Sequence, residues 1–286
     1  MASITERKKL RSGVALTKID RGRPPIKMSN YCRWKHGPDR VMAVVLLLPA
    51  VPLIALLILL VRVTSRGPGI YRQVRVGRNG KYFTMYKIRT MRHDAEARTG
   101  PTWATNNDPR LTGLGRFIRS VHLDELPQLI NVVKGDMDLV GPRPERPEFT
   151  HFLAQEIDEY VARLVVRPGV TGLAQVNLPP DSDLNSVRRK LVLDLEYVRH
   201  ASLTLDLRIL CWTALRLCGM KKVSMRILRL YRAVNLPEDV AQRSGPPDTA
   251  VVRAATVDTV TVPRQGDAHS RKGNPLPQVS QQTKPR

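Results

Sequence analysis

An unbroken run of 21 apolar residues, from Val41 to Val61, constrains the fold of this chain more than any other feature. As an α-helix the run would extend about 31 Å, which matches the hydrocarbon core of a bilayer. It begins too far along the chain, and is too long, to be the apolar part of a signal peptide. The run therefore predicts a membrane-embedded helix.

The flanks and prolines of this run indicate how the helix enters the membrane. Pro49 and Pro52 each remove a helical hydrogen bond and bend the chain. Positive charge near a membrane helix favours the cytoplasmic side, and here it stands at both ends. The flanking basic residues are Arg33, Lys35 and Arg40 before the run and Arg62, Arg66, Arg72 and Arg75 after it. A re-entrant helix, which dips into one leaflet and returns, satisfies both observations, with a single spanning helix as the alternative.

The basic composition predicts an anionic partner. The formal net charge of +22 suits nucleic acid, anionic lipid or a phosphorylated substrate. Only 5% of residues are aromatic, and no zinc-finger spacing, RNA-binding aromatic motif or coiled-coil basic region occurs. We therefore expect a membrane and a phosphorylated substrate, and no nucleic acid. Cys32, Cys211 and Cys218 form no metal or disulfide framework, which suits a reducing, cytosol-facing domain.

Composition divides the chain into four predicted parts. Residues 1–38 form a basic, flexible arm able to lie on anionic lipid, and residues 39–64 hold the membrane helix. Residues 65–233 form a folded, cytosol-facing domain. Residues 234–286 contain no aromatic residue and seven prolines, so they cannot bury enough apolar surface to offset chain entropy. This last part is predicted to be a disordered tail.

Apolar periodicity within residues 65–233 predicts an α+β domain. Two alternating runs, 71–76 and 82–88, flank the turn sequence Asn79-Gly80 and predict an antiparallel hairpin. Helical spacing recurs in four segments, with Gly135 as a stop for the second: 114–121, 126–133, 149–165 and 187–197. Two further segments, 203–217 and 224–231, mix leucine with arginine. Such segments are typical of amphipathic interfacial helices, although ordinary core-facing helices share the pattern.

The adjacent acids Asp124 and Glu125 lie just ahead of a predicted helix. Pro127 is tolerated only in a first helical turn, so it predicts a helix start with Asp124 at or near the N-cap. Backbone donors there favour an ionised carboxylate and attract phosphate. An ionised, positioned aspartate is a competent nucleophile, although a simple acidic N-cap has the same pattern. Because neighbouring residues on a helix point in different directions, we expect one acid to attack and the other to hold metal or structure.

A proline-rich loop, residues 141–147, follows and carries Arg143 and Arg146. Its three prolines fix the backbone, so these arginines lose little entropy on binding an anion. A guanidinium group matches phosphate oxygens bidentately. Lys87, Arg89, Arg116 and Arg119 add positive charge upstream. Two acids among these basic groups indicate chemistry on an anionic phosphate substrate, with a plain proline-rich connector as the structural alternative.

These motifs resemble those of the bacterial sugar transferases, the monotopic polyprenyl-phosphate phosphoglycosyl transferases. The similarity runs from about residue 39 to about residue 213. Its motifs include Arg75-Val-Gly-Arg-Asn-Gly80, Tyr86-Lys-Ile-Arg-Thr-Met91, Leu123-Asp-Glu-Leu-Pro-Gln128, Lys134-Gly-Asp-Met137, Val140-Gly-Pro-Arg-Pro144 and Arg167-Pro-Gly-Val-Thr-Gly172. The chain departs from the family at Val51 and His122, where serine is common. These changes concern the membrane bend and the edge of the site.

The resemblance implies transfer of a sugar-1-phosphate from a UDP-sugar to polyprenyl phosphate. Asp124 is the expected nucleophile, which forms a phosphosugar-aspartate and expels UMP, and Glu125 is its partner. The pair is expected to hold a magnesium ion, Mg²⁺, that offsets phosphate charge. The expected substrate-binding residues are Lys87, Arg89, Arg119, Arg143 and Arg146.

The chain is thus predicted to be a membrane-associated α+β enzyme of the undecaprenyl-phosphate hexose-1-phosphate transferase type. The resemblance places it in the bacterial inner membrane with its catalytic domain facing the cytosol, where it initiates exopolysaccharide or other glycan assembly. Two alternatives are a UDP-releasing glycosyltransferase and a catalytically silent membrane scaffold. The sugar, the lipid length and the oligomeric state are not predicted.

Overall fold

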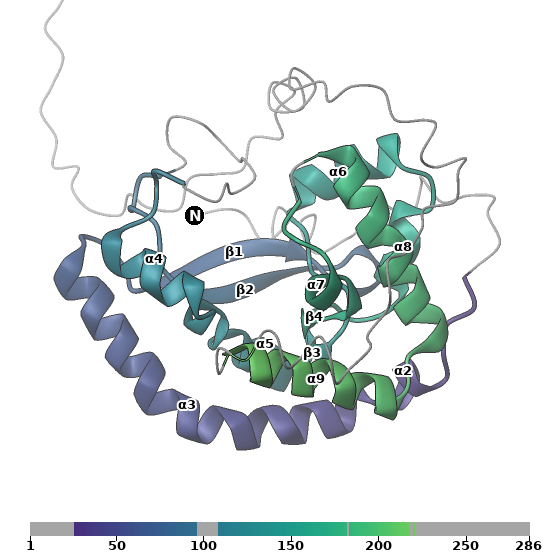
Figure 1. Ribbon diagram of the computed structural model, residues 1–286, viewed down its shortest axis with the longest axis horizontal. Coiled ribbons are helices and arrows are strands. Elements are labelled where there is room, and N and C mark those ends of the chain that lie inside the picture. Colours follow the sequence, from purple (N-terminus) through teal and green to yellow (C-terminus); the bar gives the residue numbers. More distant parts are fainter. Residues whose placement is uncertain (1–25, 96–107, 182, 218–219, 221–286) are drawn as a thin grey trace, which may run out of the picture.

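We analysed a computed structural model, which describes residues 26–95, 108–181, 183–217 and 220 (Figure 1). The elements in chain order are α2 (Tyr31–Trp34), α3 (His36–Thr64), β1 (Ile70–Val76), η1 (Arg78–Gly80), β2 (Tyr82–Ile88), α4 (Gly113–Ser120), η2 (Leu123–Glu125), α5 (Gln128–Lys134), β3 (Asp138–Val140), α6 (Pro147–Glu156), η3 (Tyr160–Val165), β4 (Gly169–Thr171), α7 (Leu173–Asn177), α8 (Leu184–His200) and α9 (Leu203–Leu217). The hairpin of β1 and β2 lies at the centre, the long curved helix α3 runs along one side of it, and α6 and α8 lie beyond one end of the hairpin. This arrangement confirms the predicted α+β class.

The apolar run forms one continuous helix, α3, which is long and apolar enough to cross a membrane. Pro49 and Pro52 lie inside it, and the helix follows a curved path along the domain (Figure 1). One face is buried at helical spacing by Ala43, Ala50, Ile54, Leu57 and Val61. This face packs on α4, α5, β2 and β3.

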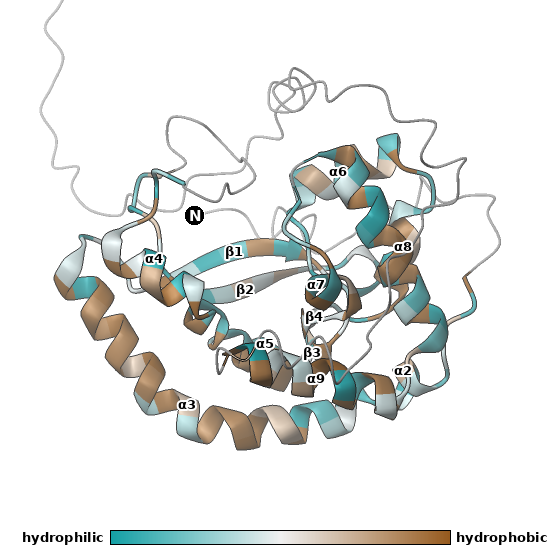
Figure 2. Cartoon of the chain, in the orientation of Figure 1, coloured by the Kyte–Doolittle hydropathy of each residue, from teal (hydrophilic) through white to brown (hydrophobic). Residues whose placement is uncertain are grey.

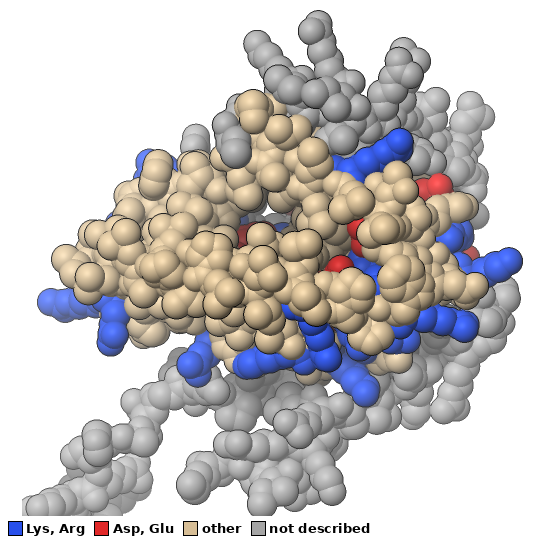
Figure 3. Space-filling model, turned by 90° about the horizontal axis from the view of Figure 1, so that it is seen from below, with Lys and Arg blue, Asp and Glu red and all other residues tan. Residues whose placement is uncertain are grey.

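The opposite face of α3 is apolar and exposed. Figure 2 shows hydrophobic residues along most of the helix, and Figure 3 shows a broad, mostly uncharged surface that has Lys and Arg along its edges. The exposed apolar residues of α3 include Val41, Val44, Val45, Leu48, Val51, Leu56, Leu59 and Val63. Because large exposed apolar patches mark interaction surfaces, this face is suited to contact lipid.

The start of α3 is anchored to the domain by a buried lysine. Lys35, only 2% exposed, donates to the Val140 carbonyl and the Tyr197 hydroxyl, both at 2.8 Å, and pairs with Asp206 at 2.5 Å. Such partners are what a buried ammonium group requires. Residues 31–38, assigned above to the flexible arm, therefore form α2 and the first turn of α3. Residues 1–25 of that arm lie outside the described residues.

The end of α3 is held by Arg89, which is buried. Its guanidinium donates to the Ser65 carbonyl at 2.9 Å, to the Ser65 hydroxyl at 2.7 Å and to the Arg66 carbonyl. Both ends of α3 are thus fixed to the same folded body.

The predicted hairpin is confirmed. β1 and β2 pair antiparallel, with Ile70 opposite Ile88 and Val76 opposite Tyr82. Asn79 has a φ of 54° and Gly80 a φ of 73°, the left-handed conformation that an Asn-Gly turn supplies. The Asn131 side chain of α5 then pairs with the open edge of β2, accepting from the Tyr86 amide at 3.1 Å and donating to the Thr84 carbonyl at 2.7 Å.

A second, parallel pair of strands, β3 and β4, was not predicted. Each has only three residues, too few for an alternating pattern to be recognised. Their backbones lie so close that a Cβ atom on Gly169 would stand 2.0 Å from the Gly141 nitrogen. This contact brings the loop at 141–147 beside the chain segment that follows η3.

The predicted helices that lie within the described residues are confirmed with one exception. α4, α5, α8 and α9 correspond to four predicted segments, and Gly135 ends α5 with a φ of 82°. The single helix predicted over 149–165 is wrong, because α6 ends at Glu156 and η3 begins at Tyr160. Glu159 between them has a φ of 61° and redirects the chain, so that tertiary contacts made by η3 override local propensity. The predicted helix at 224–231 and the predicted tail lie outside the described residues.

Candidate active site

Asp124 and Glu125 lie in η2, a short turn that joins α4 to α5. α5 begins at Gln128 with Pro127 as its N-cap, so Pro127 marks the helix start as predicted. Asp124, predicted at or near the N-cap, instead lies three residues ahead of Pro127, in η2. The reason is His122, whose φ of 57° begins a separate turn ahead of the proline. A non-glycine residue in this conformation is under backbone strain, which is often found at functional sites. α4 and α5, which flank the acidic pair in the chain, both contact the apolar helix α3.

Two cations hold Glu125. Lys87 Nζ lies 2.8 Å and Arg143 Nη2 lies 2.7 Å from the same oxygen, Glu125 Oε1. Burial alone would raise the pKa of Glu125, but Arg143 and Lys87 outweigh it and hold that pKa well below its usual range. Burial lowers the pKa of Lys87, while Glu125 raises that of Arg143. Glu125 is therefore the permanently ionised member of the pair.

Asp124 has a different environment. Its side chain is buried and forms no hydrogen bond with any described residue. Burial raises the pKa of Asp124 to about 6, partly opposed by Lys87. An aspartate that is desolvated and still ionised at neutral pH has the chemistry that a carboxylate nucleophile requires. The two acids are thus suited to the different roles predicted from the sequence.

The donor set of this pair fits a magnesium ion, Mg²⁺. Within the described residues there is no group of three or more His, Cys, Asp or Glu side chains that would bind a metal alone. Magnesium, however, is usually held by one or two carboxylates together with substrate phosphates and water. Lys87 and Arg143 both occupy Oε1 of Glu125, which leaves Oε2 and the Asp124 oxygens without a hydrogen bond from the described residues.

The structure brings together some, and not all, of the five predicted substrate-binding residues. Lys87 and Arg143 contact the pair directly, and Arg119 on α4 is close enough for its charge to lower the pKa of Asp124. Arg89 lies elsewhere, because β2 ends at Ile88 and its side chain turns to the end of α3. Arg146 lies 3.5 Å from Glu148 on α6 rather than at the acidic pair.

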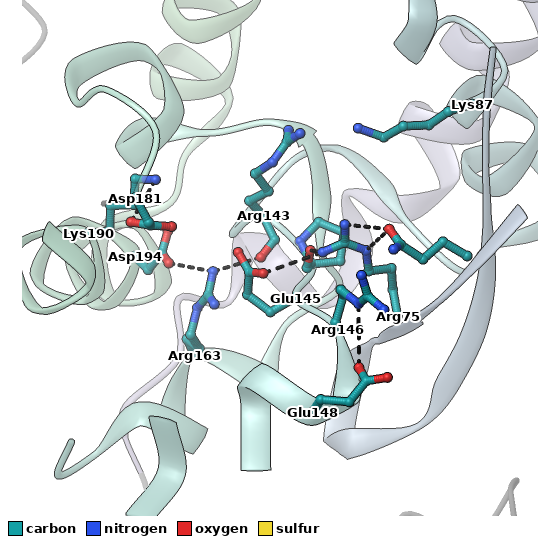
Figure 4. A network of polar contacts seen from close by, with 12 residues as sticks. Arg75, Lys87, Arg143, Glu145, Arg146, Glu148, Arg163, Asp181, Lys190 and Asp194 are labelled. Atoms are coloured by element: carbon teal, nitrogen blue, oxygen red, sulfur yellow. Dashed lines mark hydrogen bonds and ion pairs between the residues drawn. The ribbon is translucent and has the colours of Figure 1, made fainter. Parts of the chain in front are cut away.

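Several residues hold the backbone of the proline-rich loop 141–147, called the arginine loop below, and they were not predicted (Figure 4). Arg75 on β1 donates to the Pro144 carbonyl at 3.0 Å, and the Val76 amide donates to the Glu145 carbonyl at 2.9 Å. Arg163 in η3 donates to the Arg143 carbonyl at 2.8 Å. These partners are far apart in the sequence, and no spacing pattern connects them.

The fold and site define a class of protein: an α+β domain with a carboxylate pair and a cation cluster beside an exposed apolar helix. The family model described as "Bacterial sugar transferase" matches residues 30–219, which is most of the chain. The protein therefore belongs to the bacterial sugar transferase family, as the sequence motifs indicated.

Curated relatives agree with this assignment. The chain is 42% identical over 190 residues to an undecaprenyl-phosphate glucose phosphotransferase of Komagataeibacter xylinus, covering 64% of this chain and 35% of the relative. It is 40% identical over 181 residues to a UDP-glucose:undecaprenyl-phosphate glucose-1-phosphate transferase of Caulobacter vibrioides, covering 63% and 67%. It is 39% identical over 179 residues to a UDP-N-acetylgalactosamine-undecaprenyl-phosphate N-acetylgalactosaminephosphotransferase of Aeromonas hydrophila, covering 63% and 42%. The chain thus spans between about a third and two thirds of the length of these relatives.

Proposed function

We propose that this protein transfers a sugar-1-phosphate from a UDP-sugar to polyprenyl phosphate and releases UMP. The observation that carries the proposal is the asymmetry of the pair: Glu125 is held by two cations, whereas Asp124 is buried with no hydrogen-bond partner among the described residues. The relatives named above act on undecaprenyl phosphate, and two are named for UDP-sugars.

The reaction proceeds through a covalent intermediate on Asp124. A carboxylate oxygen of Asp124 attacks the β-phosphorus of the UDP-sugar, and the bond from that phosphorus to the bridging oxygen breaks, which releases UMP. An oxygen of polyprenyl phosphate then attacks the same phosphorus. The bond to Asp124 breaks, so that polyprenyl-diphosphate-sugar leaves and the carboxylate is regenerated. Because the acceptor oxygen is already anionic, no strong base is required.

The basic side chains bind and orient the phosphates. Arg143 has a rigid guanidinium group that matches phosphate oxygens, and Lys87 and Arg119 add positive charge beside Asp124. A magnesium ion bound by Asp124, Glu125 and the substrate would supply additional charge neutralisation as UMP leaves.

The apolar face of α3 supports the proposal that the site meets its lipid substrate at the membrane surface. The helix packs on the domain along its length, and both of its ends are fixed to that domain. A straight crossing would draw this polar domain into the hydrocarbon core, whereas a re-entrant helix keeps it at the interface. We infer that the protein lies in the bacterial inner membrane with this domain in the cytosol.

Measurement of the released nucleotide tests the proposal. Membranes containing the protein are given polyprenyl phosphate, magnesium and separate UDP-hexoses, including UDP-glucose and UDP-N-acetylgalactosamine. Release of UMP that depends on the lipid is expected with at least one donor. Release of UDP instead would indicate a glycosyltransferase, and no release with any donor would favour the scaffold.

A further inference from the structure

A buried arginine outside the acidic pair contacts the backbone of Arg143. Arg163 Nη2 lies 2.8 Å from the Arg143 carbonyl oxygen and 2.7 Å from Asp194 Oδ2 on α8, while Nη1 donates to the Tyr160 hydroxyl at 3.0 Å. Figure 4 shows Arg163 between Asp194 and the arginine loop, with the Arg143 guanidinium directed away from Asp194. A chain of polar contacts therefore runs from Asp194 through Arg163 and Arg143 to Glu125.

Burial of the Arg163–Asp194 ion pair carries a desolvation penalty that offsets its contribution to the stability of the fold. The Arg163 and Asp194 side chains are only 7% and 4% exposed, so both charges have lost their hydration. Replacement of such a pair by apolar residues is often neutral or stabilising. The Arg163 Nε atom also lacks a hydrogen-bond partner among the described residues, which adds to the cost of burial. The pair is therefore better explained by the geometry that it imposes than by stability.

The Arg163–Asp194 ion pair fixes the position of the Arg143 backbone. Pro144 restricts the backbone of the preceding residue to extended conformations, but it does not fix where that residue lies relative to η2. On one side, β1 holds the loop at Pro144 and Glu145. On the other side, Arg163 holds the carbonyl of Arg143 itself. Together these contacts determine where the guanidinium reaches, and a displacement of about 1 Å costs on the order of 100-fold in rate at well-ordered sites.

We propose that Arg163, held by Asp194, is a positioning residue that directs Arg143 toward Glu125 and the donor phosphates. This inference rests on the proposed function and extends it to residues that touch neither the acidic pair nor the reacting atoms.

The test replaces the ion pair without leaving a buried charge. A variant with Arg163→Met and Asp194→Leu in the same chain lacks the donor to Arg143 but keeps apolar packing. We expect its kcat/KM for the UDP-sugar and its affinity for UDP to fall about tenfold. In an Arg143→Ala background the same two changes should alter both quantities by less than about twofold, because the residue being positioned is gone.

A neighbouring ion pair provides a matched control. Lys190 and Asp181 lie 2.8 Å apart, are 16% exposed each and line the same small cavity as Arg163 and Asp194. The ion pair joins these two side chains to each other, and within the described residues neither of them donates to the backbone of the arginine loop. Lys190→Met with Asp181→Leu should therefore leave kcat/KM and UDP affinity within about twofold of the wild type. If the first double variant does not fold, Arg163→Lys serves in its place, because lysine keeps the charge but lacks the planar fork.

The inference is overturned if a folded Arg163 variant has wild-type UDP affinity and kcat/KM. It is also overturned if the tenfold loss persists in the Arg143→Ala background, since Arg163 would then act by another route. Absence of UMP release by the wild type would contradict the proposed function alone, because UDP affinity still reports the coupling of Arg163 to Arg143. Absence of UDP binding by the wild type would contradict both.

Discussion

Arg143 Nη2 lies 2.7 Å from Oε1 of Glu125, the residue adjacent to the buried carboxylate of Asp124. Lys87 Nζ reaches the same oxygen at 2.8 Å. Arg143 comes from a loop, Glu125 from the turn η2 and Lys87 from the strand β2. Their contact lowers the pKa of Glu125, whereas burial raises the pKa of the neighbouring Asp124. Glu125 is kept ionised, whereas Asp124 is desolvated and its pKa is raised to about 6.

Arg143→Ala should weaken use of the UDP-sugar. Loss of a charged hydrogen bond to phosphate corresponds to about 1.5–3 kcal/mol, which is roughly a 10- to 150-fold decrease in kcat/KM. Steady-state kinetics with the donor varied measures this effect. Arg189, an exposed arginine on α8, provides the control, since Arg189→Ala removes the same charge at a distance from the pair. An unchanged kcat/KM for Arg143→Ala would remove this residue from the donor site.

Asp124→Asn should abolish turnover and stabilise the fold. The raised pKa of Asp124, about 6, means that its ionised form is disfavoured in the folded state. That penalty is absent at low pH and complete above pH 6, so a neutral amide should raise the free energy of unfolding at pH 7.5 by roughly 1–3 kcal/mol. Glu125→Gln should have the opposite effect, because it leaves Lys87 and Arg143 without their anion. Thermal unfolding compares the two variants, and equal shifts of the same sign would contradict this account.

The pH dependence of turnover should report Asp124. Its carboxylate must be ionised to attack, so kcat/KM should fall as pH decreases through about 6. Lys87 lowers the pKa of Asp124, as do the nearby Arg119 and Arg143, whereas Glu125 raises it. Lys87→Met should therefore move the acid limb of the profile to higher pH. A limb that stays in place, or moves to lower pH, would show that another group controls the profile.

The two ends of α3 should be accessible from the same side of the membrane. Gly37 and Arg66 are exposed and lie beside the two ends of the helix that are fixed to the domain. Single cysteines introduced by Gly37→Cys and Arg66→Cys, with the native cysteines replaced, should both react with an impermeant thiol reagent in inside-out vesicles. Neither should react in right-side-out cells. Labelling of one site from each side would identify a spanning helix instead.

The parts of the fold that were predictable are those with local signals. The apolar run, the Asn79-Gly80 turn and the stop at Gly135 each follow from nearby residues, and the structure has all three. β3 and β4 could not be predicted, because strands of three residues depend on a partner distant in sequence. The break between α6 and η3 could not be predicted either, because the positive φ of Glu159 has no signal in the composition of 157–159.

The sequence predicted part of the candidate site's membership and less of its geometry. The motifs predicted that Lys87 and Arg143 belong to the site, because both lie in short sequences typical of the family, and the structure has both in contact with Glu125. They did not separate these residues from Arg89 and Arg146, whose side chains lie elsewhere through contacts with the end of α3 and with α6. The separate turn that holds Asp124 ahead of Pro127 was not predicted, because the left-handed conformation of His122 has no local sequence signal.

The most direct test of the proposed function is a search for the covalent intermediate. The purified protein is incubated with a UDP-hexose that supports turnover and magnesium, without polyprenyl phosphate, and is then examined by intact-protein and peptide mass spectrometry. The account predicts a hexose-phosphate adduct on the peptide containing Asp124, formed with one equivalent of UMP and discharged when polyprenyl phosphate is added. Turnover without any adduct, or an adduct that survives in Asp124→Asn, would contradict the role of Asp124 as the nucleophile.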